Sequence, residues 1–184
     1  MPVVDSRLPR HANTRAMETR WKPSVTVAAV IERDGRFLLV EEETSDGLML
    51  NNPAGHLEPC ESPQEACARE VLEETAYAFR PTALVGVYLS RAQRSSGEDV
   101  TYLRLAFRGE LGARDPLRRL DHGIVRTLWL TPDEVRAAAP RHRTPLLLRC
   151  MEDYLAGARY PLSLLHTHES VWCQPRQSAA ANGS

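Results

Sequence analysis

The stretch that decides the fold reads NPAGHLE at 52–58, ESPQE at 61–65 and REVLEE at 69–74. Residues 61–65, its middle part, have a strong signal for the start of a helix. Ser62 can cap, a proline follows at the first helical position, and Glu65 falls three residues after the cap. This capping box predicts a helix over about residues 63–77.

The predicted helix has an apolar arc and an acidic arc. At about 100° per residue, five residues that can pack on a sheet share the first arc: Cys67, Ala68, Val71, Leu72 and Thr75. Glu70, Glu73 and Glu74 share the second arc. Like charges this close cost only about 0.2–0.5 kcal/mol each, so a solvated acidic face is tolerated. The same spacing also offers hard oxygen ligands to Mg²⁺, and the cluster alone leaves both interpretations open.

The residues before the cluster favour the metal interpretation. The chain has Gly55, then five residues, then Glu61, then seven residues and the run at 69–74. This spacing resembles the Nudix box of the Nudix hydrolases and matches every fixed position through the final glutamate pair. Ala76 replaces the second glycine of the box, and Tyr77 stands where an aliphatic residue is usual. An alanine with positive φ at a helix exit costs about 1 kcal/mol. These departures concern the helix exit and remove no charged group.

The resemblance implies metal-assisted hydrolysis of a phosphoanhydride bond. In the family, Glu70, Glu73 and Glu74 would be catalytic and would bind Mg²⁺ or Mn²⁺, with the backbone carbonyl of Gly55 as a further ligand. Which glutamate acts as general base varies across the family and stays open.

Other box residues have supporting roles in the family. Arg69 would complete the catalytic group by orienting a neighbouring carboxylate, and Glu61 would brace the loop against the helix. Many members have a further acidic residue before the late strand, where this chain has Gly123, with Asp121 nearby.

Substrate contacts are expected from residues outside the acidic cluster. Arg104 on its strand can reach a phosphate or form an ordinary pair on the sheet face, and His56 can touch phosphate or hydrogen-bond the loop. Tyr88 and Tyr102 can stack on a ring or serve in packing.

The resemblance extends beyond the box. Over roughly residues 21–165, the chain resembles the NudJ-type branch of Nudix phosphatases. The resemblance lies in KPSVTV at 22–27, VEE at 40–42, PAGHLE at 53–58 and RYPL at 159–162. That branch implies Mg²⁺-dependent release of phosphate from thiamine-type pyrophosphates and nucleoside di- and triphosphates. Two alternatives stay open: a pyrophosphohydrolase acting on ADP-ribose or dinucleotides, and a nucleotide-binding module without hydrolysis, whose mark would be lost box carboxylates.

Hydrophobic patterning predicts the order of the elements. Strands are expected at 24–31, 36–41, 82–90, 100–108 and 124–130, loops at 44–50 and 109–120, and later helices from Thr131 and at 144–156. The acidic run at 41–43 is expected to be solvated. This order favours a mixed sheet with helices on both sides. The resemblance implies the same α/β class, a Nudix-type α/β/α sandwich.

Composition limits the other possibilities. The 184 residues are 42% hydrophobic with a net charge of −1, which suits one domain and gives no general attraction to nucleic acid or acidic membranes. No apolar run reaches about 18 residues. We expect a flexible arm at 1–20, a Nudix domain at 21–165 and a disordered tail at 166–184. We also expect a cytoplasmic monomer or homodimer acting on a small phosphorylated molecule.

Overall fold

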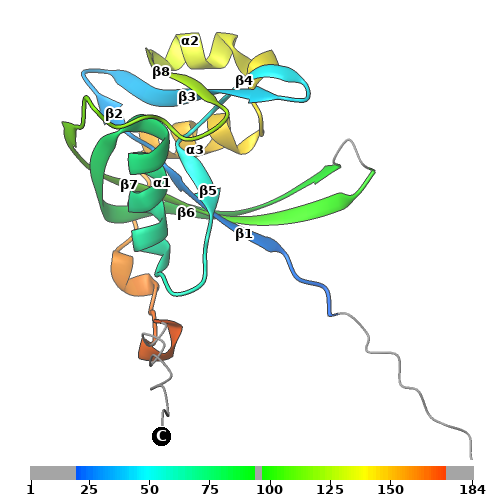
Figure 1. Cartoon of the computed structure of the whole chain (residues 1–184), viewed down its shortest axis with the longest axis vertical. Coiled ribbons are helices and arrows are strands. Elements are labelled where there is room, and N and C mark those ends of the chain that lie inside the picture. Colours follow the sequence, from blue (N-terminus) through cyan, green and yellow to red (C-terminus); the bar gives the residue numbers. More distant parts are fainter. Residues whose placement is uncertain (1–19, 94–96, 173–184) are drawn as a thin grey trace, which may run out of the picture.

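Two four-stranded β-sheets carry the fold in the computed structural model, which describes residues 20–93 and 97–172 (Figure 1). Sheet A has the order β5 (Ala54–His56), β1 (Ser24–Ala29), β7 (Asp99–Arg114), β6 (Tyr77–Gln93). In sheet B, β3 (Arg36–Thr44) pairs with β2 (Glu32–Arg33), β4 (Gly47–Asn51) and β8 (Ile124–Leu130). The β1 and β7 strands are parallel and the other pairs are antiparallel, so sheet A is mixed.

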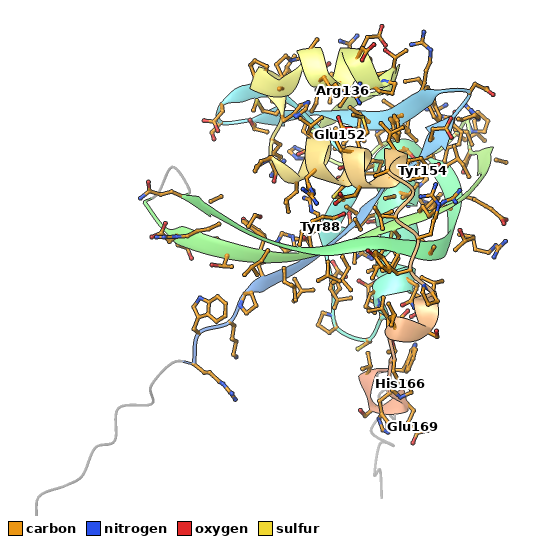
Figure 2. The ribbon with its side chains drawn as sticks, turned by 180° about the vertical axis from the view of Figure 1, so that it is seen from behind. Tyr88, Arg136, Glu152, Tyr154, His166 and Glu169 are labelled. Atoms are coloured by element: carbon orange, nitrogen blue, oxygen red, sulfur yellow. The ribbon has the colours of Figure 1, made fainter. Side chains whose placement is uncertain are left out.

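Helices cover both faces of sheet A. Along β7, Leu105 and Phe107 pack in one core cluster with Val71 of α1 (Pro63–Thr75). Ala106, on the alternate face, packs with α3 (Leu146–Leu155). The short helix α2 (Pro132–Ala137) is tied to α3 by Arg136 and Glu152, whose Nε and Oε1 lie 2.7 Å apart (Figure 2). Three 3-10 turns complete the elements: η1 (Ala139–Arg141), η2 (Leu162–Leu164) and η3 (Glu169–Val171). The predicted α/β/α class is confirmed.

The start of α1 has the predicted capping box. The Ser62 hydroxyl accepts from the Glu65 amide at 3.2 Å, and the Glu65 carboxylate accepts from the Ser62 amide at 2.8 Å. The helix ends at Thr75, where Ala76 takes a left-handed conformation with φ 61° and donates its N–H to Leu72. The alanine therefore adopts the cap geometry that glycine usually provides.

Several predicted element boundaries are wrong. The expected loop at 44–50 contains β4, and the expected loop at 109–120 begins with six residues of β7, which runs to Arg114. The β2 and β5 strands were also missed. Both are at most three residues long, which is too short for an alternating pattern to appear.

The acidic run at 41–43 is not simply solvated. Glu41 and Glu42 are buried, and only Glu43 is exposed. Glu41 pairs with Arg126 on β8 at 2.7 Å and also with Arg141, while Glu42 pairs with Arg143. These arginines lie at least 84 residues away in the chain, so local charge patterning could not reveal them.

The predicted arm at 1–20 lies outside the described residues except for Arg20, and the predicted tail is described only up to residue 172, including η3. Within the described ranges, no helix combines the length and apolar character needed to cross a membrane.

We expect Ser62→Ala to lower the free energy of unfolding by about 1 kcal/mol, because the Glu65 amide at the helix start loses its acceptor. Denaturant unfolding measures this, with Ser45→Ala at an exposed turn as the control. Equal losses in the two variants would contradict the role of the cap.

Candidate active site

Arg69 is the centre of a hydrogen-bond network that joins α1 to the loop before it. Its Nε and Nη2 bind the two Glu61 oxygens at 3.0 and 2.8 Å, and Nη2 also donates to the His56 carbonyl at 3.0 Å. Its Nη1 donates to Glu70 at 2.7 Å and to Glu73 at 3.0 Å. One guanidinium thus fixes the loop and two of the three glutamates predicted as ligands. The bonds from Arg69 also hold the pKa of Glu61 below its usual value.

Gly55 allows the Glu70 carboxylate to lie directly against the backbone. A Cβ built on Gly55 would stand 2.1 Å from the Cδ and Oε1 atoms of Glu70. No side chain fits there. The carboxylate therefore faces the loop residue whose carbonyl is the predicted metal ligand.

Glu70 and Glu74 are more deeply buried than the sequence pattern predicted. Their exposed fractions are 9% and 8%. Ala68 and Leu72, expected inside, are half-buried. The buried face of α1 is therefore rotated toward the acidic arc, because both carboxylates have partners inside: Arg69 for Glu70, and for Glu74 the Ala54 amide at 2.9 Å.

Burial disfavours the charged form of both carboxylates. It raises the pKa of Glu70, and it raises the pKa of Glu74 to about 8, with the neighbouring charges of Glu70 and Asp121 adding to the effect on Glu74. The bond from Ala54 and the charge of Arg104 act in the opposite direction. Two desolvated carboxylates side by side form a region where a cation would be strongly favoured.

Asp121 lies next to the cluster. Its amide donates to the Glu73 carbonyl at 2.9 Å, which places it at the exit of the helix. Its charge contributes to raising the pKa of Glu74, and it lies three residues before β8.

The residues fit Mg²⁺ in donor chemistry. Glu70, Glu73, Glu74 and the Gly55 carbonyl provide hard oxygens, and Mg²⁺ commonly takes only one or two carboxylates with waters and substrate phosphates. In the described parts of the chain, no three His, Cys, Asp or Glu side chains converge on one point. Arg69 explains this, because it holds Glu70 and Glu73.

The two predicted substrate contacts lie in one row across sheet A. His56 pairs with Thr26, and Thr26 pairs with Arg104, so all three side chains face the same side of the sheet. The His56 ring is exposed, 6.5 Å from the Tyr102 ring between centroids. Arg104 is buried, and its Nε and Nη1 have no hydrogen-bond partner among residues 20–93 and 97–172.

Sequence reasoning missed three buried polar residues nearby. Thr26, Asn51 and Asn52 each bury a side-chain oxygen that has no partner in the part of the chain that the structure describes. The Asn pair directly precedes the box loop, and two amides between an apolar strand and that loop were an available signal. Thr26 gave no signal, because only the strand register places it beside Arg104.

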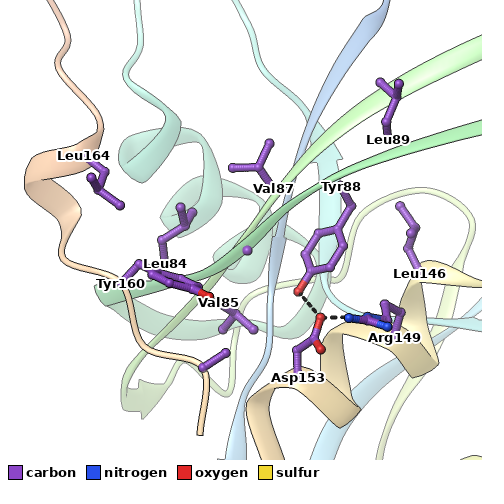
Figure 3. A pocket seen from close by; sticks show the side chains of 12 residues that line it. Leu84, Val85, Val87, Tyr88, Leu89, Leu146, Arg149, Asp153, Tyr160 and Leu164 are labelled. Carbon is purple, nitrogen blue, oxygen red and sulfur yellow. Dashed lines mark hydrogen bonds and ion pairs between the residues drawn. The ribbon is translucent and has the colours of Figure 1, made fainter. Parts of the chain in front are cut away.

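A groove of about 720 Å³ lies elsewhere, along the edge strand β6 (Figure 3). Its polar side holds Tyr88, Asp153 and Arg149, and apolar residues such as Leu84 and Leu164 line the rest. No residue of the acidic cluster lines it. The predicted chemistry and this groove are separate features.

The fold and the site together define the class of the protein. Residues 20–149 match the family model described as the NUDIX domain, and the chain belongs to this family of hydrolases. It is 35% identical over 145 residues to Phosphatase NudJ of Escherichia coli K12, covering 79% of this chain and 92% of the relative.

Solved structures agree with this membership. A NUDIX hydrolase from Nitrosomonas europaea is 53% identical with a TM-score of 0.76, covering 80% of this chain and 98% of that one. A MutT NUDIX hydrolase from Burkholderia pseudomallei has a TM-score of 0.60 at 20% identity, covering 72% and 98%, and shows the shared fold.

We expect Gly55→Ala to destabilise the protein by about 1–3 kcal/mol, because the new methyl group must displace the Glu70 carboxylate. Thermal and denaturant unfolding measure the change. Gly112→Ala is the matched control, since a Cβ there meets its nearest neighbour at 3.2 Å and needs only a small shift. A Gly55→Ala protein as stable as the control would show that the close approach is not required.

Proposed function

We propose that this Nudix hydrolase depends on Mg²⁺ and releases phosphate from thiamine-type pyrophosphates and from nucleoside di- and triphosphates. The observation that carries the proposal is the pair of buried carboxylates, Glu70 and Glu74, held beside Gly55. The likeness to Phosphatase NudJ supports phosphate release as the reaction.

In this proposal, the ion site consists of Glu70, Glu73, Glu74 and the Gly55 carbonyl. Mg²⁺ or Mn²⁺ bound there would supply charge neutralisation of the phosphates and a water activated for attack. Arg69 positions Glu70 and Glu73 through its Nη1, and its fork to Glu61 fixes the loop that carries Gly55. Bringing the glutamates onto one ion would require Glu70 and Glu73 to shift from Arg69.

Arg104 and His56 are the proposed substrate contacts. Arg104 is a permanent cation with free donors, suited to phosphate oxygens. His56 adjoins Gly55 and exposes its ring, so it can meet a phosphate held at the carboxylates. The two residues would bind and orient the phosphate chain from one side of sheet A.

The proposal also includes the setting of the enzyme. We place it in the cytoplasm as a monomer or homodimer that acts on small phosphorylated molecules. Light scattering of the purified chain measures the oligomeric state directly.

Replacing Glu74 by glutamine should lower phosphate release roughly 100-fold or more, because one charged oxygen ligand is lost. Glutamine keeps the shape of the side chain and an oxygen for the Ala54 amide, so the fold should persist. Phosphate release with thiamine pyrophosphate, GTP and GDP measures the effect, with circular dichroism as the folding check. Glu110→Gln, at an exposed ion pair with Arg80, is the control. Wild-type turnover by Glu74→Gln would contradict the assignment.

The identity of the products separates the proposal from the dinucleotide alternative. With Mg²⁺, we expect orthophosphate from thiamine pyrophosphate and GTP, and little cleavage of ADP-ribose. Chromatography of the products distinguishes orthophosphate from AMP and ribose phosphate. Faster cleavage of ADP-ribose than of every diphosphate and triphosphate tested would favour the alternative, and no turnover of any substrate would favour a binding module.

A further inference from the structure

Two polar side chains in the middle of sheet A are buried without a partner. Arg104 is 8% exposed and Thr26 is 6% exposed. The Nε and Nη1 of Arg104 and the Oγ1 of Thr26 are enclosed and form no hydrogen bond among the described residues. Nη2 is not among the enclosed atoms, so it is the guanidinium nitrogen that an incoming group can reach.

The strand register places these two side chains together. Thr26 and Arg104 are direct partners in the parallel pair of β1 and β7. They therefore face the same side of the sheet with their backbones about 4.8 Å apart. A hydroxyl and a guanidinium at this spacing can donate to one anionic group.

The neighbour of Arg104 on the other strand is directed elsewhere. Tyr88, opposite Arg104 on β6, donates its hydroxyl to Asp153 at 2.9 Å. Its ring folds back over Gly86, where an added Cβ would lie 2.5 Å from the Tyr88 oxygen. Asp153 also accepts from Arg149 at 2.9 Å, so this carboxylate is occupied by two other donors (Figure 3).

The remaining nearby groups do not pair with Arg104. Burial raises the pKa of the Cys150 thiol to about 11, so this thiol is neutral at pH 7. Burial lowers the pKa of Arg104, and the charge of Glu74 acts in the opposite direction, yet Glu74 accepts its hydrogen bond from the Ala54 amide. The described chain thus gives the guanidinium no hydrogen-bonded anion.

A buried charge without a partner is strongly unfavourable, and such a group requires an explanation such as a bound ion or ligand. The position of Arg104 indicates which ligand. His56, Thr26 and Arg104 lie on successive strands, so Arg104 is about 10 Å from the backbone of His56. The charges of Arg104 and Glu74 also act on each other, which places the guanidinium near the acidic cluster. A group bound by Arg104 would therefore lie beside a phosphate held at the acidic helix. It would be the next group in the phosphate chain of the substrate.

We propose that Arg104 and Thr26 form an anion subsite that binds the leaving phosphate, the phosphoryl group that stays on the organic part of the substrate. The proposal rests on the proposed function. In the hydrolysis, the bond between the terminal phosphorus and the bridging oxygen breaks, and the oxygen of water joins the terminal phosphorus while the water gives up a proton to solvent. The electron pair of the broken bond stays on the bridging oxygen, so the leaving phosphate gains negative charge. Nη2 of Arg104 meets that charge directly, and Oγ1 of Thr26, which is enclosed in this structure, would donate after the Arg104 side chain shifts.

The subsite is tested without metal, in EDTA, by calorimetric titration of the full chain with thiamine monophosphate and with inorganic phosphate. We expect Arg104→Met to weaken binding about 10-fold or more, and Thr26→Val about 3-fold, as suits a charged and a neutral donor. Arg80→Met is the control. Arg80 lies on β6 in an exposed ion pair with Glu110, so binding should be unchanged.

Thermal melting adds a readout that a structural arginine would not give. Removing a buried charge without a partner should leave the melting temperature of the ligand-free Arg104→Met protein equal to wild type or higher. Thiamine monophosphate should raise the melting temperature of wild type and not of the variant. Thr26→Val, nearly isosteric, keeps the test valid if Arg104→Met does not fold.

Three results would overturn the subsite: no metal-free binding by wild type, equal affinity in wild type and both variants, or a ligand-free Arg104→Met protein that melts below wild type. Failure of the proposed function gives a different pattern. If Glu74→Gln retained full phosphate release while Arg104→Met and Thr26→Val lost metal-free binding, the subsite would stand and the role of the acidic helix would not.

Discussion

The desolvation of two carboxylates on one helix is the constraint on which the rest of the site depends. Glu70 and Glu74 lie on the buried side of α1, where charge is costly, and every neighbouring feature reduces that cost. Arg69 provides the compensating cation, the Ala54 amide provides a donor, and Gly55 leaves room for the carboxylate. The glycine, the arginine and the glutamates are therefore one physical unit. Removing Arg69 would leave the buried Glu70 carboxylate without its cation, and a side chain at Gly55 would displace it.

The two sheets give this unit a fixed place. The β5 strand is only three residues long, yet its pairing with β1 sets the position of Gly55 and His56 relative to Thr26 and Arg104. The capped start of α1 fixes where the helix begins, and the helix contacts β5, β1 and β6. A local motif and a long-range strand register together produce a polar row beside an acidic cluster.

The box and its helix could be predicted from sequence because their signals are local. The cap, the proline and the glutamate spacing all fall within the residues that form α1, and the helix begins where they indicate. The burial of Glu41 and Glu42 could not be predicted in the same way, since their arginines come from β8 and the segment after α2. The same limit applies to Thr26. Its role depends on a parallel pairing with a strand more than 70 residues away, which hydrophobic periodicity does not encode.

The left-handed Ala76 bears on how the box varies among relatives. Glycine at this position would relieve about 1 kcal/mol of backbone strain and would remove a buried methyl group worth about 0.8 kcal/mol. The two effects nearly cancel, so exchanging alanine and glycine at this position changes the free energy of unfolding little, and selection for stability acts only weakly on it. The position can drift between the two residues over evolutionary time, and an altered box glycine is poor evidence that a homologue has lost its activity.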